Sequence, residues 1–262
     1  FFVDVRGQKP HFFEEQAKQL NQELEQIPWR RDAQGAYSYF QAHKPVREQT
    51  SPIGHAVRAL YLYSGMTDVA VENGDEELWA VCQKLWEETT RKQMYLTGGV
   101  GPKQHGERFT FDYDLPNEFS YNETCASIAL MMWAHRLLQA DPDRKYSDII
   151  ERTLYNNILG GVSLSGDRFY YANPLAAYPD AYEQHNEPNF AVTLGRQSWF
   201  DCACCPPNLA RILASLGGYI YSVGQQDIYT HLYVQGTAGV ELDGQVWTLE
   251  QQTDYPHHGT VR

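Results

Sequence analysis

The sequence predicts a mainly α protein that ends in the start of an antiparallel β-sandwich. Apolar residues recur at helical spacing over most of the first two thirds of the chain, and short stretches of alternating apolar and polar residues follow. A Gly217-Gly218 pair separates the two patterns. We therefore expect a helical domain over residues 1–217 and the start of a β-sandwich domain over residues 218–262.

Five segments carry the helical pattern: residues 53–63, 76–91, 125–138, 146–159 and 206–216. The third is apolar nearly all round, which predicts a buried helix. The fourth follows the turn residues Asp141-Pro142-Asp143. The fifth begins at Pro206, and proline suits the first turn of a helix.

Four segments carry the strand pattern: residues 219–223, 228–234, 239–242 and 245–252. The last two are separated by Asp243-Gly244, a pair that is typical of a two-residue β-hairpin turn. These strands are too few to complete a sandwich, so we expect only its beginning.

The composition excludes some classes of partner. A net charge of −12 argues against nucleic-acid binding, which needs a basic surface. No run of about 18 apolar residues occurs, which argues against a membrane span. Aromatic residues make up 13% of the chain, with 18 Tyr and 6 Trp, and this suits either a large helical core or a sugar-binding cleft. The sequence leaves a homodimer open.

The cysteines favour metal binding or catalysis over a disulfide framework. Their number is five, which is odd, and three of them fall in Cys202-Ala203-Cys204-Cys205. This usage favours a reducing, cytoplasmic compartment.

Glu123, Cys125, Cys204 and Cys205 form a candidate zinc site, because zinc takes thiolate and carboxylate ligands. Residues two apart on a regular helix point away from each other, so a shared ion requires Glu123 and Cys125 to lie in extended chain before a helix. Cys205 precedes a proline, which also biases it toward an extended conformation. Two other interpretations remain open here: buried free thiols in a helical core, and a Cys204–Cys205 disulfide.

Two further residues are candidates for chemistry. Glu107 lies in the Gly-rich segment 96–109, and loops of this kind often carry general acids. The segment lacks the Lys-Ser/Thr of a phosphate-binding loop. His55 begins an apolar helix, where a core histidine is the simpler interpretation.

The segments GHAVRALY, GGVG…GERF, YNETCA and CACCPPN, in this order, resemble glycoside hydrolase family 127, the β-L-arabinofuranosidase family. The match runs from Asp4–Gly7 to Tyr255-Pro256. The resemblance implies that residues 1–217 are part of an (α/α)6 barrel and that β-sandwich domains follow. It also implies an L-arabinofuranoside substrate, as a small molecule or an oligosaccharide.

The resemblance further implies residue roles. The zinc ligands fall on Glu123, Cys125, Cys204 and Cys205, with Cys204 as nucleophile of a retaining reaction and Glu107 as acid/base. His55, Glu151 and Tyr171 fall on positions that hold the sugar. Cys202 falls near the site and is not a ligand.

Two other functions stay open from the sequence. One is a glycosidase or lyase in which carboxylates do the chemistry and zinc is structural. The other is a non-catalytic carbohydrate-binding protein.

Overall fold

The computed structural model describes residues 35–118, 120–177, 179 and 193–262. The Asp4–Gly7 segment of the resemblance lies outside these residues. The described part is mainly helical, as predicted, with a small antiparallel strand region near the C-terminus.

The helices, in chain order, are α2 (Gly35–Tyr39), η2 (Val46–Glu48), α3 (Ala56–Asn73), α4 (Glu76–Lys92), α5 (Thr124–Ala140), α6 (Arg144–Thr153), η3 (Leu154–Ile158), η4 (Leu159–Gly161), α8 (Cys205–Ser215) and η5 (Leu216–Tyr219). All five predicted helices are present. The fourth ends its α-helical part at Thr153 and continues as a π turn, η3, and a 3-10 turn, η4. We attribute this change to Asn157, whose side chain contacts Ser127 Oγ at 2.5 Å and Thr97 Oγ1 at 3.1 Å.

Side chains define two of the helix starts. The carboxylate of Asp75 accepts a hydrogen bond from the Leu78 N–H at 3.0 Å and so caps α4. Asp143 caps α6 in the same way by accepting from the Lys145 N–H at 2.9 Å. The predicted Asp141-Pro142-Asp143 turn therefore ends in a capping residue.

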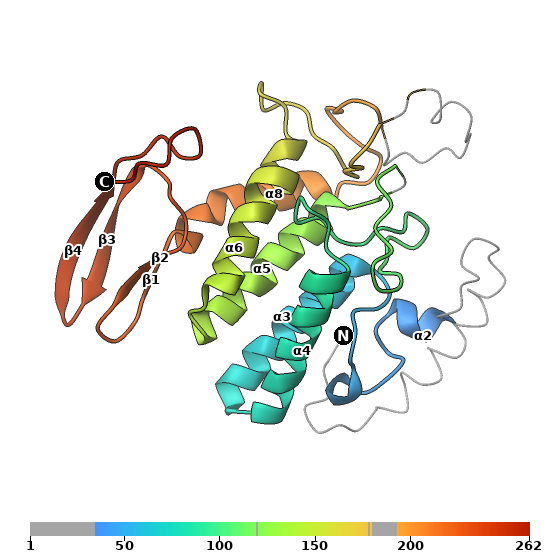
Figure 1. Cartoon of the computed structure of the whole chain (residues 1–262), viewed down its shortest axis with the longest axis horizontal. Helices are drawn as coiled ribbons and strands as arrows, with labels where there is room; N and C mark the ends of the chain where they lie inside the picture. Colours follow the sequence, from blue (N-terminus) through green and yellow to red (C-terminus); the bar gives the residue numbers. More distant parts are fainter. Residues whose placement is uncertain (1–34, 119, 178, 180–192) are drawn as a thin grey trace.

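The buried helix α5 lies at the centre of the helical part. It packs against α3, α6 and α8, while α4 packs against α3 (Figure 1). A series of rings joins four of these helices: Trp133 lies 5.1 Å from Tyr63 and 5.3 Å from Trp86, and Trp86 lies 5.2 Å from Tyr146. The large aromatic content therefore serves the core at these positions, and closure of the helices into a barrel stays a prediction.

The strands form two separate antiparallel pairs, β1 (Tyr221–Val223) with β2 (Ile228–Thr230) and β3 (Gly236–Leu242) with β4 (Gln245–Gln251). Between β3 and β4, Asp243 and Gly244 both have positive φ, 53° and 70°. Two such residues make the turn that matches strand twist, so the hairpin prediction is confirmed. The sandwich, and the domain division near residue 217, stay predictions.

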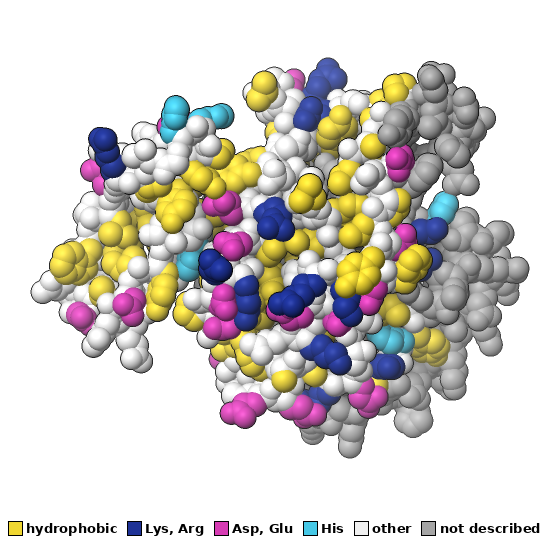
Figure 2. Space-filling model, viewed as in Figure 1, with side chains coloured by type: hydrophobic (Ala, Val, Ile, Leu, Met, Phe, Trp, Pro, Cys, Tyr) yellow, Lys and Arg dark blue, Asp and Glu magenta, His cyan; other side chains and the backbone are white. Residues whose placement is uncertain are grey.

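The surface of the helical part is mixed in charge. Figure 2 shows basic and acidic side chains interspersed over the visible face of these helices. In the part of the chain that the structure describes, no helix combines the length and the apolar composition needed to cross a membrane.

We expect Trp133→Ala to lower the free energy of unfolding by about 3–5 kcal/mol, because it removes a fully buried ring and leaves a cavity. Trp133 Nε1 also donates a hydrogen bond to Thr67 Oγ1 at 2.9 Å, which the substitution removes. The matched control is Trp247→Ala, since Trp247 is 51% exposed. Urea unfolding measures both, and equal losses would contradict the central place of Trp133.

Candidate metal and catalytic site

The candidate site lies where three helices begin. His55, Glu123 and Cys204 occupy the N-cap positions of α3, α5 and α8, and none of these side chains caps its own helix. The three helices start on the same side of the helical part (Figure 1). Helix N-termini carry unpaired N–H groups and the positive end of the dipole, so this arrangement favours negative charge between them.

The local backbone differs from the sequence expectation in two places. Glu123 has a non-helical N-cap conformation, with φ −56° and ψ 136°, but Cys125 already lies in the first turn of α5. This combination brings both side chains to one point, because the chain turns between them. Cys205 is the first residue of α8 rather than an extended residue before it. The following prolines occupy the first turn, where their missing N–H groups have no helical partner to lose.

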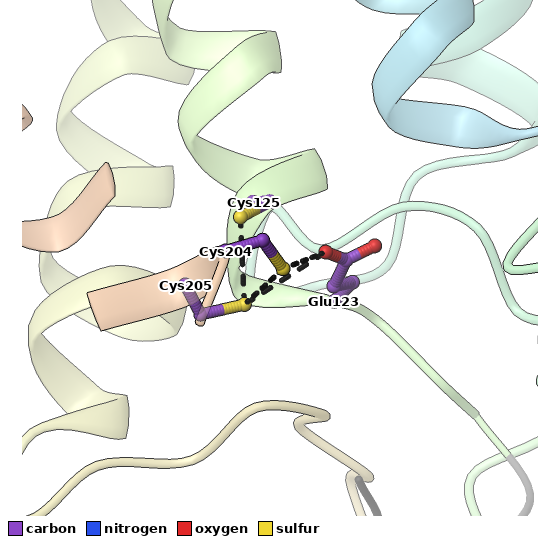
Figure 3. A group of neighbouring side chains, drawn as sticks. All are labelled: Glu123, Cys125, Cys204 and Cys205. Atoms are coloured by element: carbon purple, nitrogen blue, oxygen red, sulfur yellow. Dashed lines mark hydrogen bonds between the residues drawn. The ribbon is translucent and has the colours of Figure 1, made fainter. Parts of the chain in front are cut away.

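Three thiols and one carboxylate converge at this point, as Figure 3 shows. Cys125 Sγ lies 3.4 Å from Cys205 Sγ, and Cys204 Sγ lies 3.8 Å from Cys205 Sγ. The Cys204 and Cys205 thiols donate to Glu123 Oε1 at 3.5 and 3.8 Å. The sulfur atoms are too far apart for a disulfide bond, and the cysteines are free.

These spacings fit a tetrahedral metal ion. Metal–sulfur bonds of about 2.3 Å and metal–oxygen bonds of about 2.0 Å at tetrahedral angles place the ligand atoms roughly 3.5–3.8 Å apart. The ligand atoms of Glu123, Cys125, Cys204 and Cys205 all lie within 4.8 Å of one another. The four residues could therefore hold a metal ion with little rearrangement.

Burial and mutual repulsion decide the protonation of the metal-free cluster. Burial raises the pKa of the Glu123 carboxyl well above its ordinary value, and the charges of Glu107 and Cys204 raise it further. Burial likewise raises the pKa of the Cys205 thiol. Hydrogen bonds from Cys204 and Cys205 lower the pKa of Cys125 to about 5. The raised pKa values of Glu123 and Cys205 favour their protonated forms, so a binding cation must displace protons.

Glu107 lies beside the cluster, in the loop before α5. Its Oε2 lies 2.9 Å from His55 Nε2, and its Oε1 accepts a hydrogen bond from Tyr121 Oη at 2.8 Å. Burial acts to raise the pKa of Glu107, but these bonds to His55 and Tyr121 outweigh it and hold the pKa below its ordinary value. The structure thus brings Glu107 and His55 together with Glu123.

Glycines hold this loop close to the helices. A side chain at Gly98 would meet Thr153 Oγ1 at 2.3 Å, and one at Gly101 would meet Ala56 Cβ at 2.8 Å. Both glycines have positive φ, 85° and 78°. The Gly-rich segment therefore serves close packing next to the site, which agrees with its lack of a phosphate-binding motif.

Tyr171 also contacts the cluster. Its Oη lies 2.7 Å from Cys204 Sγ, and its carbonyl accepts a hydrogen bond from the Thr124 N–H at 2.9 Å. Cys202, which is half-buried, lies outside the group of metal-ligating atoms. Glu151 is placed differently from these residues, because its carboxylate accepts a hydrogen bond from Tyr255 Oη at 2.7 Å.

Sequence reasoning did not single out Tyr121, although its side chain is 3% exposed and bonds to Glu107. The YNETCA segment carries no clear signal for it: Tyr121 and Glu123 are two apart, but Asn122 between them has a positive φ of 46°, so the segment is not a regular strand whose alternate residues share a face. Nothing in that spacing indicates which carboxylate the phenol meets.

The chain is similar to known proteins over its whole length. Residues 1–218 match the family model of the β-L-arabinofuranosidase GH127 catalytic domain. The chain is 38% identical to a non-reducing end β-L-arabinofuranosidase of Bifidobacterium longum subsp. longum, over all of this chain and 39% of that protein.

Two solved structures are also similar. A GH127 β-L-arabinofuranosidase from Geobacillus stearothermophilus T6 has a TM-score of 0.89 and 49% identity, over 99% of this chain and 40% of that one. A GH127 β-arabinofuranosidase has a TM-score of 0.78 and 43% identity, over 86% of this chain and 33% of that one. The chain thus spans about two fifths or less of the length of these relatives.

We expect Cys125→Ser to lose bound divalent metal and to melt several degrees lower than the metal-loaded wild type, because a serine hydroxyl replaces thiolate poorly. Metal analysis after loading and desalting, together with thermal melting, measures this. Cys202→Ser and Cys82→Ser are the controls, since neither thiol belongs to the cluster. Loss of metal from either control, with retention in Cys125→Ser, would contradict the ligand set.

Proposed function

Because the chain belongs to the GH127 β-L-arabinofuranosidase family, we propose that it carries the catalytic centre of a retaining glycoside hydrolase that releases terminal β-L-arabinofuranose or a related sugar. The observation that carries this proposal is the position of Glu107 beside a cluster of three thiols and a carboxylate. The choice of sugar is supported by the similarity to β-L-arabinofuranosidases.

Zinc is the ion we propose for the cluster. Three soft thiolates with one carboxylate at tetrahedral spacing suit zinc, whereas magnesium and calcium prefer oxygen ligands alone. When bound, zinc would keep the cysteines deprotonated and act as a Lewis acid toward sulfur.

Cys204 is the nucleophile in this proposal. Cys125 is 4% exposed and Cys205 is fully buried, whereas Cys204 is only half-buried and is therefore the thiol that a sugar can reach. Its sulfur attacks the anomeric carbon as the glycosidic C–O bond breaks. Tyr171, at 2.7 Å from this sulfur, would orient it and contact the sugar.

Glu107 is the proposed acid/base. It gives a proton to the departing glycosidic oxygen, then takes one from the water that displaces the Cys204 sulfur from the anomeric carbon. In a retaining reaction the two catalytic groups lie close together, and the Glu107 carboxylate is within 4.8 Å of Glu123, which itself contacts Cys204.

The change of protonation at Glu107 can come from His55. The His55 contact helps to keep the pKa of Glu107 low. If His55 turns to a sugar hydroxyl, Glu107 loses that partner while burial remains, so its pKa rises and it becomes an acid. Binding of the sugar would thereby convert Glu107 into the proton donor.

Three residues are proposed to hold the sugar. His55 and Tyr171 are supported by their contacts with Glu107 and Cys204. Glu151 instead contacts Tyr255, and its assignment rests on the family resemblance alone.

We expect Glu107→Gln to lower turnover by about a hundredfold or more on arabinosides with poor leaving groups, and by much less on activated aryl arabinosides. The reason is that protonation matters most when the departing oxygen is basic. Asp112→Asn, a change of a half-exposed carboxylate in the same loop, should leave turnover unchanged. Steady-state kinetics on both substrate types decides, and equal losses would argue for a structural role.

We expect a haloacetamide or epoxide analogue of the sugar to label wild type at Cys204, as located by peptide mass mapping. Metal-loaded Cys205→Ser should still be labelled at Cys204, more slowly, because its zinc shell lacks one thiolate. Cys204→Ser should carry no label at any metal load.

Labelling at Cys202, Cys205 or Glu123 would overturn the choice of nucleophile. Labelling at a carboxylate would favour the carboxylate-based enzyme. Wild type that takes up zinc but neither reacts nor turns over p-nitrophenyl β-L-arabinofuranoside would favour a carbohydrate-binding protein.

A further inference from the structure

The two carboxylate oxygens of Glu123 lie in different surroundings. Oε1 accepts hydrogen bonds from Cys204 and Cys205. Oε2 is buried and has no hydrogen-bond partner, and Figure 3 shows it pointing away from the thiols. Glu123 as a whole is 4% exposed. A buried carboxylate oxygen without a donor is costly, so Oε2 is a strong candidate for binding a cation.

His55 and Glu107 complete a second group of donors around Glu123. His55 Nε2 lies 2.9 Å from Glu107 Oε2, and one ligating atom from each of these three residues lies within 4.8 Å of the others. An imidazole nitrogen and two carboxylate oxygens are ligands that zinc and cobalt accept. Tyr121 donates to Oε1 of Glu107, so the oxygen of Glu107 that faces His55 is Oε2.

We propose that His55, Glu107 and Oε2 of Glu123 form a second divalent-cation site, with Glu123 bridging it to the thiol site. An ion there occupies the carboxylate of Glu107 and the nitrogen with which His55 faces it, so the second ion inhibits turnover. The inhibitory consequence rests on the proposed role of Glu107. The site itself rests only on the donor geometry.

Charge favours a second cation. Three thiolates and one carboxylate exceed the charge of a single divalent ion, and Glu107 adds another negative group within a few ångströms. Arg58 is the positive side chain that faces Glu107. It is exposed and lies 4.7 Å over the Phe40 ring, where solvent screens its charge. The second ion has fewer ligands and no thiolate, so it binds more weakly than the first.

The test titrates further Zn²⁺ into protein already loaded with one zinc, followed by calorimetry and by metal analysis after equilibrium dialysis. Turnover of p-nitrophenyl β-L-arabinofuranoside is measured in the same solutions. We expect a second, weaker equivalent to bind and turnover to fall about a hundredfold as it fills, the size of an acid/base contribution. A mild chelator that removes only the second ion should restore turnover.

Three variants locate the ion. His55→Gln and Glu107→Gln should each bind only one equivalent of zinc. Both variants are made so that the test still works if one of them does not fold. His258→Ala should still bind two, since His258 and Asp254, with an exposed contact of 4.0 Å, represent adventitious surface binding. With Co²⁺ as the probe, the first equivalent should give sulfur-to-metal charge-transfer absorption and the second should add none.

A single equivalent in wild type, or a second equivalent that persists in both His55→Gln and Glu107→Gln, would overturn the site. A second ion that binds in wild type and disappears in these variants, yet leaves turnover unchanged, would overturn the inhibitory role and with it the proposed role of Glu107. If one-zinc protein shows no turnover at all, the binding measurements still decide the site, while the proposed function fails independently.

Discussion

Four groups that ionise to anions share one buried point, and the rest of the site depends on how their charge is compensated. Glu123, Cys125, Cys204 and Cys205 lie 3.4–3.8 Å from their neighbours in the cluster. They cannot all be charged in a low-dielectric interior without a cation. The starts of α5 and α8 supply only about half a positive charge each. Protons or a metal ion must supply the remainder, and the proposed reaction uses the metal-bound form.

Some residues of the site lie at helix starts, whereas Glu107 lies in a loop. The three helix starts fix His55, Glu123 and the cysteine pair. Glu107 instead comes from a loop that backbone hydrogen bonds hold to the chain at the start of α3. The Ala56 N–H donates to the Glu107 carbonyl at 2.8 Å, and the Phe109 N–H donates to the Gly54 carbonyl at 3.0 Å. In the proposed reaction, Glu107 would therefore exchange hydrogen-bond partners while the four proposed metal ligands stay in place. The closeness of Glu107 to Glu123 supports both proposals, the retaining reaction and the second cation site.

The sequence was most informative where local chemistry decides structure. Helical periodicity located α5, and Asp243-Gly244 located the hairpin, because both depend on neighbouring residues only. The convergence of Glu123, Cys125, Cys204 and Cys205 was also predicted, although the sequence alone left free thiols or a disulfide open, and the bound metal stays a prediction. The backbone around the cluster was not predicted: proline preference suggested an extended Cys205, but α8 begins there because the first turn accepts proline. The Tyr121–Glu107 contact could not be foreseen, because it joins residues whose spacing along the chain carries no signal.

X-ray absorption at the zinc edge tests the proposed ligand set, because it identifies and counts the ligands of the bound ion. With one zinc per chain bound to the three cysteines and Glu123, we expect three sulfur atoms at about 2.3 Å and one oxygen at about 2.0 Å from the zinc. Four sulfur atoms would mean that Cys202 replaces Glu123. A shell of nitrogen and oxygen without sulfur would mean that the thiols do not bind the metal. Either result would contradict the proposed ligand set.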